Sequence, residues 1–98
     1  MTFEWDEEKN RSNYVKHGID FNDATEVFAS VRATSIDNRM EYGEIRKVTI
    51  GSIGRSECVV VYTERDGATR IISARKASVR ERSKYNEFIE SRANEETQ

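Results

Sequence analysis

The sequence predicts an α+β fold with two N-terminal helices, an antiparallel sheet of about four strands and a C-terminal helix. Three observations predict this class. The apolar residues are mostly β-branched, since 8 Val and 8 Ile occur with no Leu, and branched side chains favour strands. Helical patterns occupy both ends of the chain and strand patterns its middle, which is typical of helices packed on a strand meander. Asp66-Gly67 separates the last two strand patterns and is typical of a two-residue hairpin turn.

The first helix has signals at both of its ends. Residues 3–5 form a candidate short strand, and Asp6 follows as a good N-cap. Acidic residues at the next two positions suit the positive end of a helix dipole. We therefore expect a helix over residues 7–16, with Gly18 at the position where a left-handed residue closes it.

A second helix is expected over residues 21–29, with Asp20 as its cap. Its apolar residues recur at helical spacing and lie on one face. They are Phe21, Ala24, Val27 and Phe28.

Strand patterns follow from residue 33 onward. They cover residues 33–37, 46–52, 57–65 and 69–76, the first of them weakly. On the last strand, alternation places Ser73 and Arg75 on one face and Ile72 and Ala74 on the other. Because an arginine is poorly suited to a helix-covered core, we expect Ser73 and Arg75 on the open face and Ile72 and Ala74 inside.

The C-terminal helix begins with a capping box, Ser78 at the N-cap and Glu81 three residues later. We expect it to end at about Arg92 and residues 93–98 to fray. No linker or internal repeat divides the chain, so residues 1–98 are expected to form one domain.

Several functional classes are excluded by what the sequence lacks. It has no apolar run long enough for a membrane span, and its N-terminus is acidic without a signal core. Cys58 and His17 are the sole cysteine and histidine, so an intrachain disulfide, a cysteine-based zinc site or a two-histidine iron site is not expected. The sequence predicts a cytoplasmic protein with no cofactor, no metal and no membrane partner.

The small net charge conceals a segregation of charges along the chain. Residues 1–45 carry a net charge of −5, residues 46–84 one of +6, and residues 85–98 one of −3. Eleven of the sixteen basic residues are arginine, which suits bidentate contacts to phosphate. The basic segment is either a solvated charged face or a nucleic-acid-binding patch.

Two ordered sets of short motifs run along most of the chain. The first comprises Phe3-Glu4-Trp5-Asp6, Lys9, Asn13, Lys16-His17-Gly18, Phe21, Ala24 and Val27-Phe28. The second comprises Val61-Tyr62-Thr63-Glu64-Arg65, the run from Arg70 to Ala77, Glu81-Arg82 and Tyr85. In this order and spacing they resemble the BrnT toxins over about residues 3–88. The segment 38–44 departs from the resemblance, and nothing is transferred there.

The resemblance implies a type II toxin with a RelE-like fold and a ribonuclease activity that inhibits translation. It implies neutralisation by a BrnA-like antitoxin and repression of the toxin's own promoter, with operator DNA contacted only through the complex. It also allows a toxin–toxin contact within a heterotetramer.

Metal-free RNA cleavage needs groups that move two protons and stabilise a dianionic phosphorane. The catalytic candidates are Arg75, Arg80, Arg65, Tyr62 and His17. The RNA-binding candidates are Arg70, Lys76, Ser73 and Arg46. Arg80 is a candidate because a cation in the first turn of a helix opposes the helix dipole. This unfavourable position has no structural reason and therefore favours a role in binding phosphate or a partner.

Some of these residues have equally simple structural explanations. His17 is either catalytic or a favourable cation at a helix C-terminus, and Tyr62 is either a proton donor or a core aromatic. At the level of the whole chain, a non-catalytic nucleic-acid-binding or repressor subunit is the main alternative. A pure interaction module, with charges that serve dimerisation, is a further one.

Overall fold

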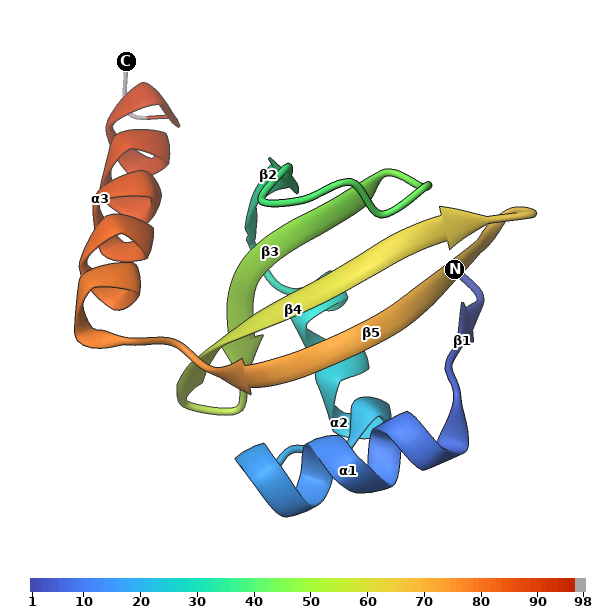
Figure 1. Ribbon diagram of the computed structural model, residues 1–98. Coiled ribbons are helices and arrows are strands. Elements are labelled where there is room, and N and C mark those ends of the chain that lie inside the picture. Colours follow the sequence, from blue (N-terminus) through green and yellow to red (C-terminus); the bar gives the residue numbers. More distant parts are fainter. Residues whose placement is uncertain (97–98) are drawn as a thin grey trace.

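The computed structural model describes residues 1–96 and has the predicted α+β class (Figure 1). Its elements are β1 (Phe3–Glu4), α1 (Glu7–His17), α2 (Phe21–Ala24), the 3₁₀ helix η1 (Thr25–Ala29), β2 (Ala33–Asp37), β3 (Arg46–Ile53), β4 (Ser56–Arg65), β5 (Ala68–Lys76) and α3 (Val79–Glu96). The predicted caps of the first helix are confirmed. The Asp6 carboxylate accepts hydrogen bonds from the backbone N–H of Glu8 and Lys9, and Gly18 closes α1 at a φ of 74°.

The described residues form one sheet of five strands in the order β1-β5-β4-β3-β2. The prediction of about four antiparallel strands was therefore short by one, and the sheet is mixed. The extra strand is β1, which pairs in parallel with β5 over two residues, Phe3 with Thr69 and Glu4 with Arg70. The candidate strand at residues 3–5 is thus present, but a segment this short joins a sheet only through its partner, which local sequence does not reveal.

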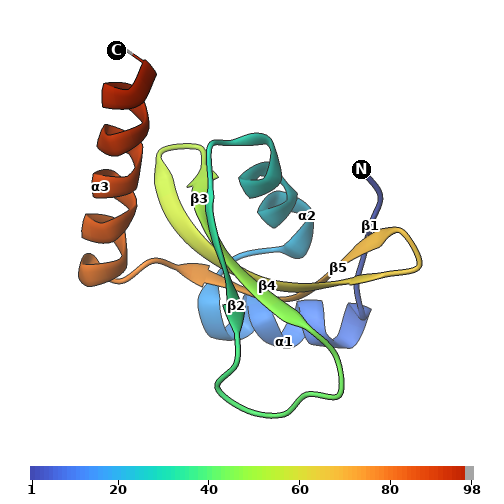
Figure 2. The same ribbon diagram turned by 90° about the horizontal axis from the view of Figure 1, so that it is seen from above.

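The N-terminal helices cover one face of the sheet and leave much of the other open (Figure 2). The core between them is formed by Ile19, Phe21, Ala24, Val27, Cys58, Val60, Ile71 and Ala74. The helix predicted over residues 21–29 is instead split into α2 and η1. The tighter 3₁₀ winding brings Val27 against Gly51 of β3, where an added Cβ would lie 2.9 Å from Val27 Cγ1. Only glycine permits this approach.

A bulge between β4 and β5 corrects the predicted alternation of the last strand. Val61 pairs with Ser73 but Tyr62 pairs with Ile71, so Ile72 is the extra residue. Ile71 is consequently buried and Ile72 only half-buried, the reverse of the predicted inward position of Ile72. Ala74 is fully buried, and Ser73 and Arg75 line the open face, as predicted.

Helix α3 begins with the predicted capping box, since Ser78 N–H donates to Glu81 Oε1 over 2.8 Å and Glu81 N–H donates to Ser78 Oγ over 3.2 Å. It projects from the sheet and is tied back by Tyr85, whose hydroxyl donates to Val31 O over 2.6 Å (Figure 1). It continues to Glu96 instead of ending at about Arg92, because no glycine or proline stops it there. The rest of the tail predicted to fray, residues 97–98, lies outside the described residues. Among residues 1–96, no helix is long and apolar enough to cross a membrane.

Candidate functional site

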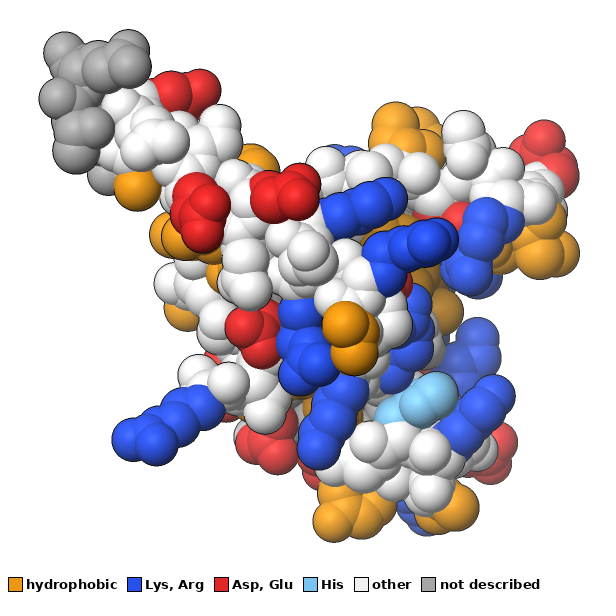
Figure 3. Space-filling model, turned by 90° about the vertical axis from the view of Figure 1, so that its left-hand side faces the viewer, with side chains coloured by type: hydrophobic (Ala, Val, Ile, Leu, Met, Phe, Trp, Pro, Cys, Tyr) orange, Lys and Arg blue, Asp and Glu red, His pale blue; other side chains and the backbone are white. Residues whose placement is uncertain are grey.

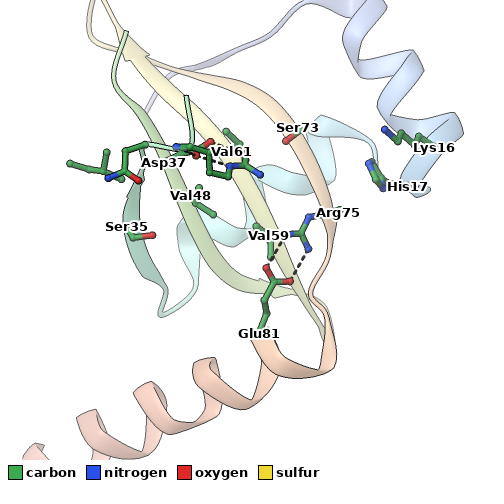
Figure 4. A pocket seen from close by; sticks show the side chains of 13 residues that line it. Lys16, His17, Ser35, Asp37, Val48, Val59, Val61, Ser73, Arg75 and Glu81 are labelled. Carbon is green, nitrogen blue, oxygen red and sulfur yellow. Dashed lines mark hydrogen bonds and ion pairs between the residues drawn. The ribbon is translucent and has the colours of Figure 1, made fainter. Parts of the chain in front are cut away.

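The open face of the sheet contains a hollow of about 500 Å³ (Figure 4). Val48 of β3 and Val59 and Val61 of β4 contribute apolar side chains. The remaining lining residues are Lys16, His17, Ser35, Ile36, Asp37, Asn38, Arg39, Ser73, Arg75 and Glu81. We call this cavity the open-face hollow. It brings together the end of α1, the strands β2 to β5 and the start of α3.

Arg75 is held at the hollow by a bidentate ion pair with Glu81. Its Nη1 and Nη2 donate to the two Glu81 carboxylate oxygens over 2.7 and 2.8 Å, and Nη1 also donates to Lys76 O over 3.2 Å. The Arg75 hydrogen bond lowers the pKa of Glu81 from its usual 4.5 to about 2. The same pair raises the pKa of Arg75, so both groups are charged at neutral pH.

A second arginine–carboxylate pair lies at the β2 end of the hollow. Arg39 Nε and Nη2 each donate to Asp37 over 2.8 Å, and the Tyr42 hydroxyl donates to Asp37 Oδ2 over 3.1 Å. The Asp37 side chain is 1% exposed and that of Arg39 74%. The Arg39 hydrogen bonds hold the pKa of Asp37 well below its usual range. A shielded carboxylate thus anchors an exposed guanidinium.

The last turn of α1 contributes Lys16 and His17. Its position depends on Asn13, whose buried amide donates to Ile19 O and Ala74 O and accepts from the Ala74 N–H. Since Ala74 directly precedes Arg75, this contact places the histidine end of α1 beside the catalytic candidate of β5. In Figure 4, His17 and Arg75 lie on the β5 side of the hollow and Asp37 on the other.

Three of the nine predicted site residues line the open-face hollow: His17, Ser73 and Arg75. Arg80 lies close by, exposed in the first turn of α3 next to Glu81, but does not line it. The structure thus brings together candidates from α1 and β5 that are more than fifty residues apart in sequence.

The other five predicted residues lie elsewhere. Arg70 pairs with Glu4 at 3.6 Å, and Arg65 pairs with Glu44 at 3.2 Å near the hairpin tip. Lys76 lines a different surface beside Cys58, and Arg46 lies 4.0 Å from the centre of the Tyr42 ring.

Tyr62 is 3% exposed on the helix-covered face. Its ring packs on Phe28 with centroids 4.9 Å apart, and its hydroxyl accepts a hydrogen bond from Arg32 over 3.2 Å. Of the two interpretations of Tyr62, proton donor or core aromatic, these surroundings are those of a core aromatic.

Sequence reasoning missed Lys16 and Arg39 as lining residues. Lys16 precedes the only histidine, and that adjacency was an available signal. Arg39 lies in a polar loop with no pattern of its own, and only its pairing with Asp37 reveals it.

The hollow is dominated by cations that can meet an anionic ligand. Lys16, Arg39 and Arg75 oppose Asp37 and Glu81, which leaves one net positive charge before His17 is counted. On the face seen in Figure 3, Lys and Arg side chains gather beside the histidine. Fixed guanidinium groups suit phosphate, and an adjacent imidazole suits proton transfer. Within residues 1–96, no group of three or more His, Cys, Asp or Glu residues is placed to hold a metal ion.

Comparison with known proteins agrees with this chemistry. The family model described as the ribonuclease toxin BrnT of type II toxin–antitoxin systems matches residues 5–81. A search of curated proteins gave no match. The matched segment contains β2 to β5 entirely and begins directly after β1, and it includes Lys16, His17, Arg39, Arg75 and Glu81 of the hollow. Because the match spans most of the sequence, the chain belongs to the BrnT family of ribonuclease toxins of type II toxin–antitoxin systems.

Proposed function

We propose that this toxin is an endoribonuclease that cleaves RNA at the open-face hollow by attack of the neighbouring 2′-OH, without a metal ion. The observation that carries the proposal is the fixed Arg75 guanidinium, which shares one open cavity with His17. Cleavage of RNA inhibits translation.

The reaction needs no group beyond the RNA and the side chains. The 2′-oxygen loses its proton and forms a bond to phosphorus, which produces a dianionic phosphorane. The bond from phosphorus to the 5′-oxygen then breaks, and that oxygen receives a proton. The products are a 2′,3′-cyclic phosphate and a 5′-hydroxyl end. Two proton transfers and one charged intermediate are the demands on the protein.

Arg75 is suited to stabilise the phosphorane, since its planar fork is charged and already oriented. His17 is the lining residue suited to transfer one of the protons, because an imidazole has one nitrogen that can accept a proton and one that can donate it. Glu81 is a poor general base, because its pKa of about 2 makes its carboxylate weakly basic.

The family supports the partners of this proposal. RNA is the substrate, and a BrnA-like antitoxin neutralises the toxin in the cytoplasm. The complex of the two proteins represses its promoter, and toxin–toxin contact occurs within a heterotetramer. Operator DNA is bound through the antitoxin and not at the open-face hollow.

The first prediction concerns Arg75. Arg75→Ala is expected to lower the single-turnover cleavage rate by roughly 10²- to 10³-fold, the scale of losing one preorganised donor. Arg75→Lys is expected to be nearly as inactive, since lysine keeps the charge but loses the planar fork. Thermal melts check that both variants are folded, which the partial exposure of Arg75 favours.

Arg55→Ala is the matched control, because Arg55 is exposed in the β3–β4 turn, away from the hollow. It is expected to retain the cleavage rate and to reduce the log–log salt dependence of RNA binding by at most about 0.7. A folded Arg75→Ala protein that cleaves at the wild-type rate would remove Arg75 from the site and redirect the assignment to Arg65 and Arg80. A wild-type protein that binds RNA without cleaving it would favour the non-catalytic alternative.

A further inference from the structure

The two arginine–carboxylate pairs of the open-face hollow use opposite edges of their guanidinium groups. We propose that Arg39 and Arg75 form a two-arginine clamp that grips a single RNA phosphate from two sides. The proposal rests on the proposed function for the identity of its ligand, an RNA phosphodiester. It adds Arg39, which no sequence pattern pointed to, as a binding residue for the scissile group.

Arg75 keeps one edge of its guanidinium free. Glu81 occupies the end edge formed by Nη1 and Nη2, and Lys76 O takes a further Nη1 hydrogen. Among residues 1–96, no group accepts a hydrogen bond from the side edge, formed by Nε–H and the second Nη2 hydrogen. A phosphate can therefore bind it bidentately without displacing Glu81.

Arg39 shows the complementary arrangement. Asp37 occupies its side edge, formed by Nε and Nη2, and also accepts the Arg39 backbone N–H over 3.3 Å. The end edge, formed by Nη1 and the second Nη2 hydrogen, has no acceptor in the part of the chain that the structure describes. The ion pair with the shielded Asp37 carboxylate restricts the rotation of this exposed guanidinium.

The two guanidinium groups also interact with each other. The hydrogen bond that Arg75 donates to Glu81 is the largest influence on the pKa of Arg75 and raises it, whereas the positive charge of Arg39 acts in the opposite direction. The two cations line the same hollow and repel across it. An anion between them offsets that repulsion, and a phosphodiester has two unesterified oxygens, one for each free edge.

Variants of Arg39 must be chosen so that its buried partner, Asp37, is not left without a compensating change. Arg39→Ala would leave the shielded Asp37 carboxylate without its cationic partner, which is destabilising. Arg39→Lys keeps a charge for Asp37 but has no second planar edge, and Arg39→Ala combined with Asp37→Asn removes both charges together. Arg11→Lys and Arg11→Ala are the matched controls, since Arg11 is exposed on α1 outside the hollow.

The first measurement is binding of an RNA oligonucleotide with 2′-O-methyl groups at every residue, which attack by a 2′-OH cannot cleave, as a function of salt. The Arg39→Ala/Asp37→Asn variant is expected to lose about 0.7 in log–log slope, the value for one single-strand phosphate contact. The Arg11→Ala variant is expected to keep the wild-type slope. This measurement needs no cleavage, so it tests the clamp even if the wild type proves inactive and the proposed function fails.

The second measurement is a double-mutant cycle on single-turnover cleavage. Arg39→Lys is expected to slow cleavage roughly tenfold or more, and Arg11→Lys to leave it unchanged. Because both arginines grip one phosphate, combining Arg39→Lys with Arg75→Lys is expected to cost much less than the product of the two single losses. Losses that multiply would place the arginines on different phosphates. Arg39 variants that bind and cleave like the Arg11 controls would equally overturn the clamp.

Discussion

Each arginine of the open-face hollow is oriented by a carboxylate of its own. Glu81 holds Arg75 and Asp37 holds Arg39, both through two hydrogen bonds of 2.7–2.8 Å. The pairs reduce the net charge offered to RNA, but a guanidinium already fixed loses less conformational freedom when it meets a phosphate. At this scale the carboxylates are positioning residues and the arginines are the groups that contact substrate.

Glu81 provides the prediction at the residue scale. Glu81→Gln is expected to lower kcat for RNA cleavage roughly tenfold or more with little change in KM, because Arg75 remains present but is no longer held for the transition state. Ser78→Ala is the matched control. It removes the Ser78 half of the same capping box but leaves the Arg75–Glu81 pair intact. Equal losses of kcat in both variants would mean that Glu81 acts only as a helix cap.

The pH dependence of stability checks the same pair. The folded pKa of Glu81, about 2, lies below its ordinary value of 4.5. The ion pair therefore contributes its full stability above about pH 4.5 and loses it as the pH falls toward 2. The difference in Tm between wild type and Glu81→Gln is expected to narrow over this interval.

Some residues of the site follow from sequence and others do not. Strand alternation, together with the need of a charged arginine side chain for solvent, suffices to place Ser73 and Arg75 on the open face. Arg39 escapes this reasoning, because its place depends on the fold of a loop and on one ion pair. Tyr62 has the right chemistry for catalysis, but it lies on the buried face of β4 together with Cys58 and Val60. Because β4 has apolar residues on both faces, its sequence did not reveal which face is buried.

Asn13 joins two elements that the site requires. Within the described residues, the edge of β5 at Ala74 has no neighbouring strand, because β1 pairs with β5 only at Thr69 and Arg70. The Asn13 amide takes the place of that missing neighbour by bonding both the N–H and the C=O of Ala74. One side chain thereby satisfies a sheet edge and docks the end of α1 that carries His17.

Asn13→Ala is therefore expected to destabilise the protein by about 1–3 kcal/mol, the cost of leaving buried backbone groups unpaired. Cleavage should also slow, since the docking of His17 loosens. Urea unfolding and single-turnover cleavage measure the two effects, with Ser12→Ala on the exposed face of α1 as control. An Asn13→Ala protein as stable as that control would show that packing alone holds α1 on the sheet.

Prediction of the elements succeeded where local chemistry decides their ends. Asp6, Gly18, Asp20 and the Ser78–Glu81 box all cap helices as expected. It failed where tertiary contacts decide. The parallel pairing of β1 depends on β5, the bulge at Ile72 depends on the register with β4, and the 3₁₀ winding of η1 accompanies the contact with Gly51.

At the scale of the whole molecule, the N-terminal helices cover one face of a small sheet and α3 projects from its end, which leaves the other face accessible (Figure 2). The basic segment 46–84 contains β3 to β5, so the charge segregation of the sequence becomes a property of the sheet. Residues from the acidic N-terminal part, Lys16, His17 and Arg39, complete the hollow. An arrangement of this kind suits a polyanion that crosses an open surface.

The most direct test of the account is single-turnover cleavage in EDTA of two RNAs that differ by one 2′-deoxy substitution at the cleavage site. Attack by the 2′-OH without a metal predicts that the all-ribose RNA is cleaved to a 2′,3′-cyclic phosphate and a 5′-hydroxyl. The substituted RNA should bind and stay intact. Cleavage of both RNAs at similar rates, or activity that EDTA abolishes and Mg²⁺ restores, would contradict the mechanism.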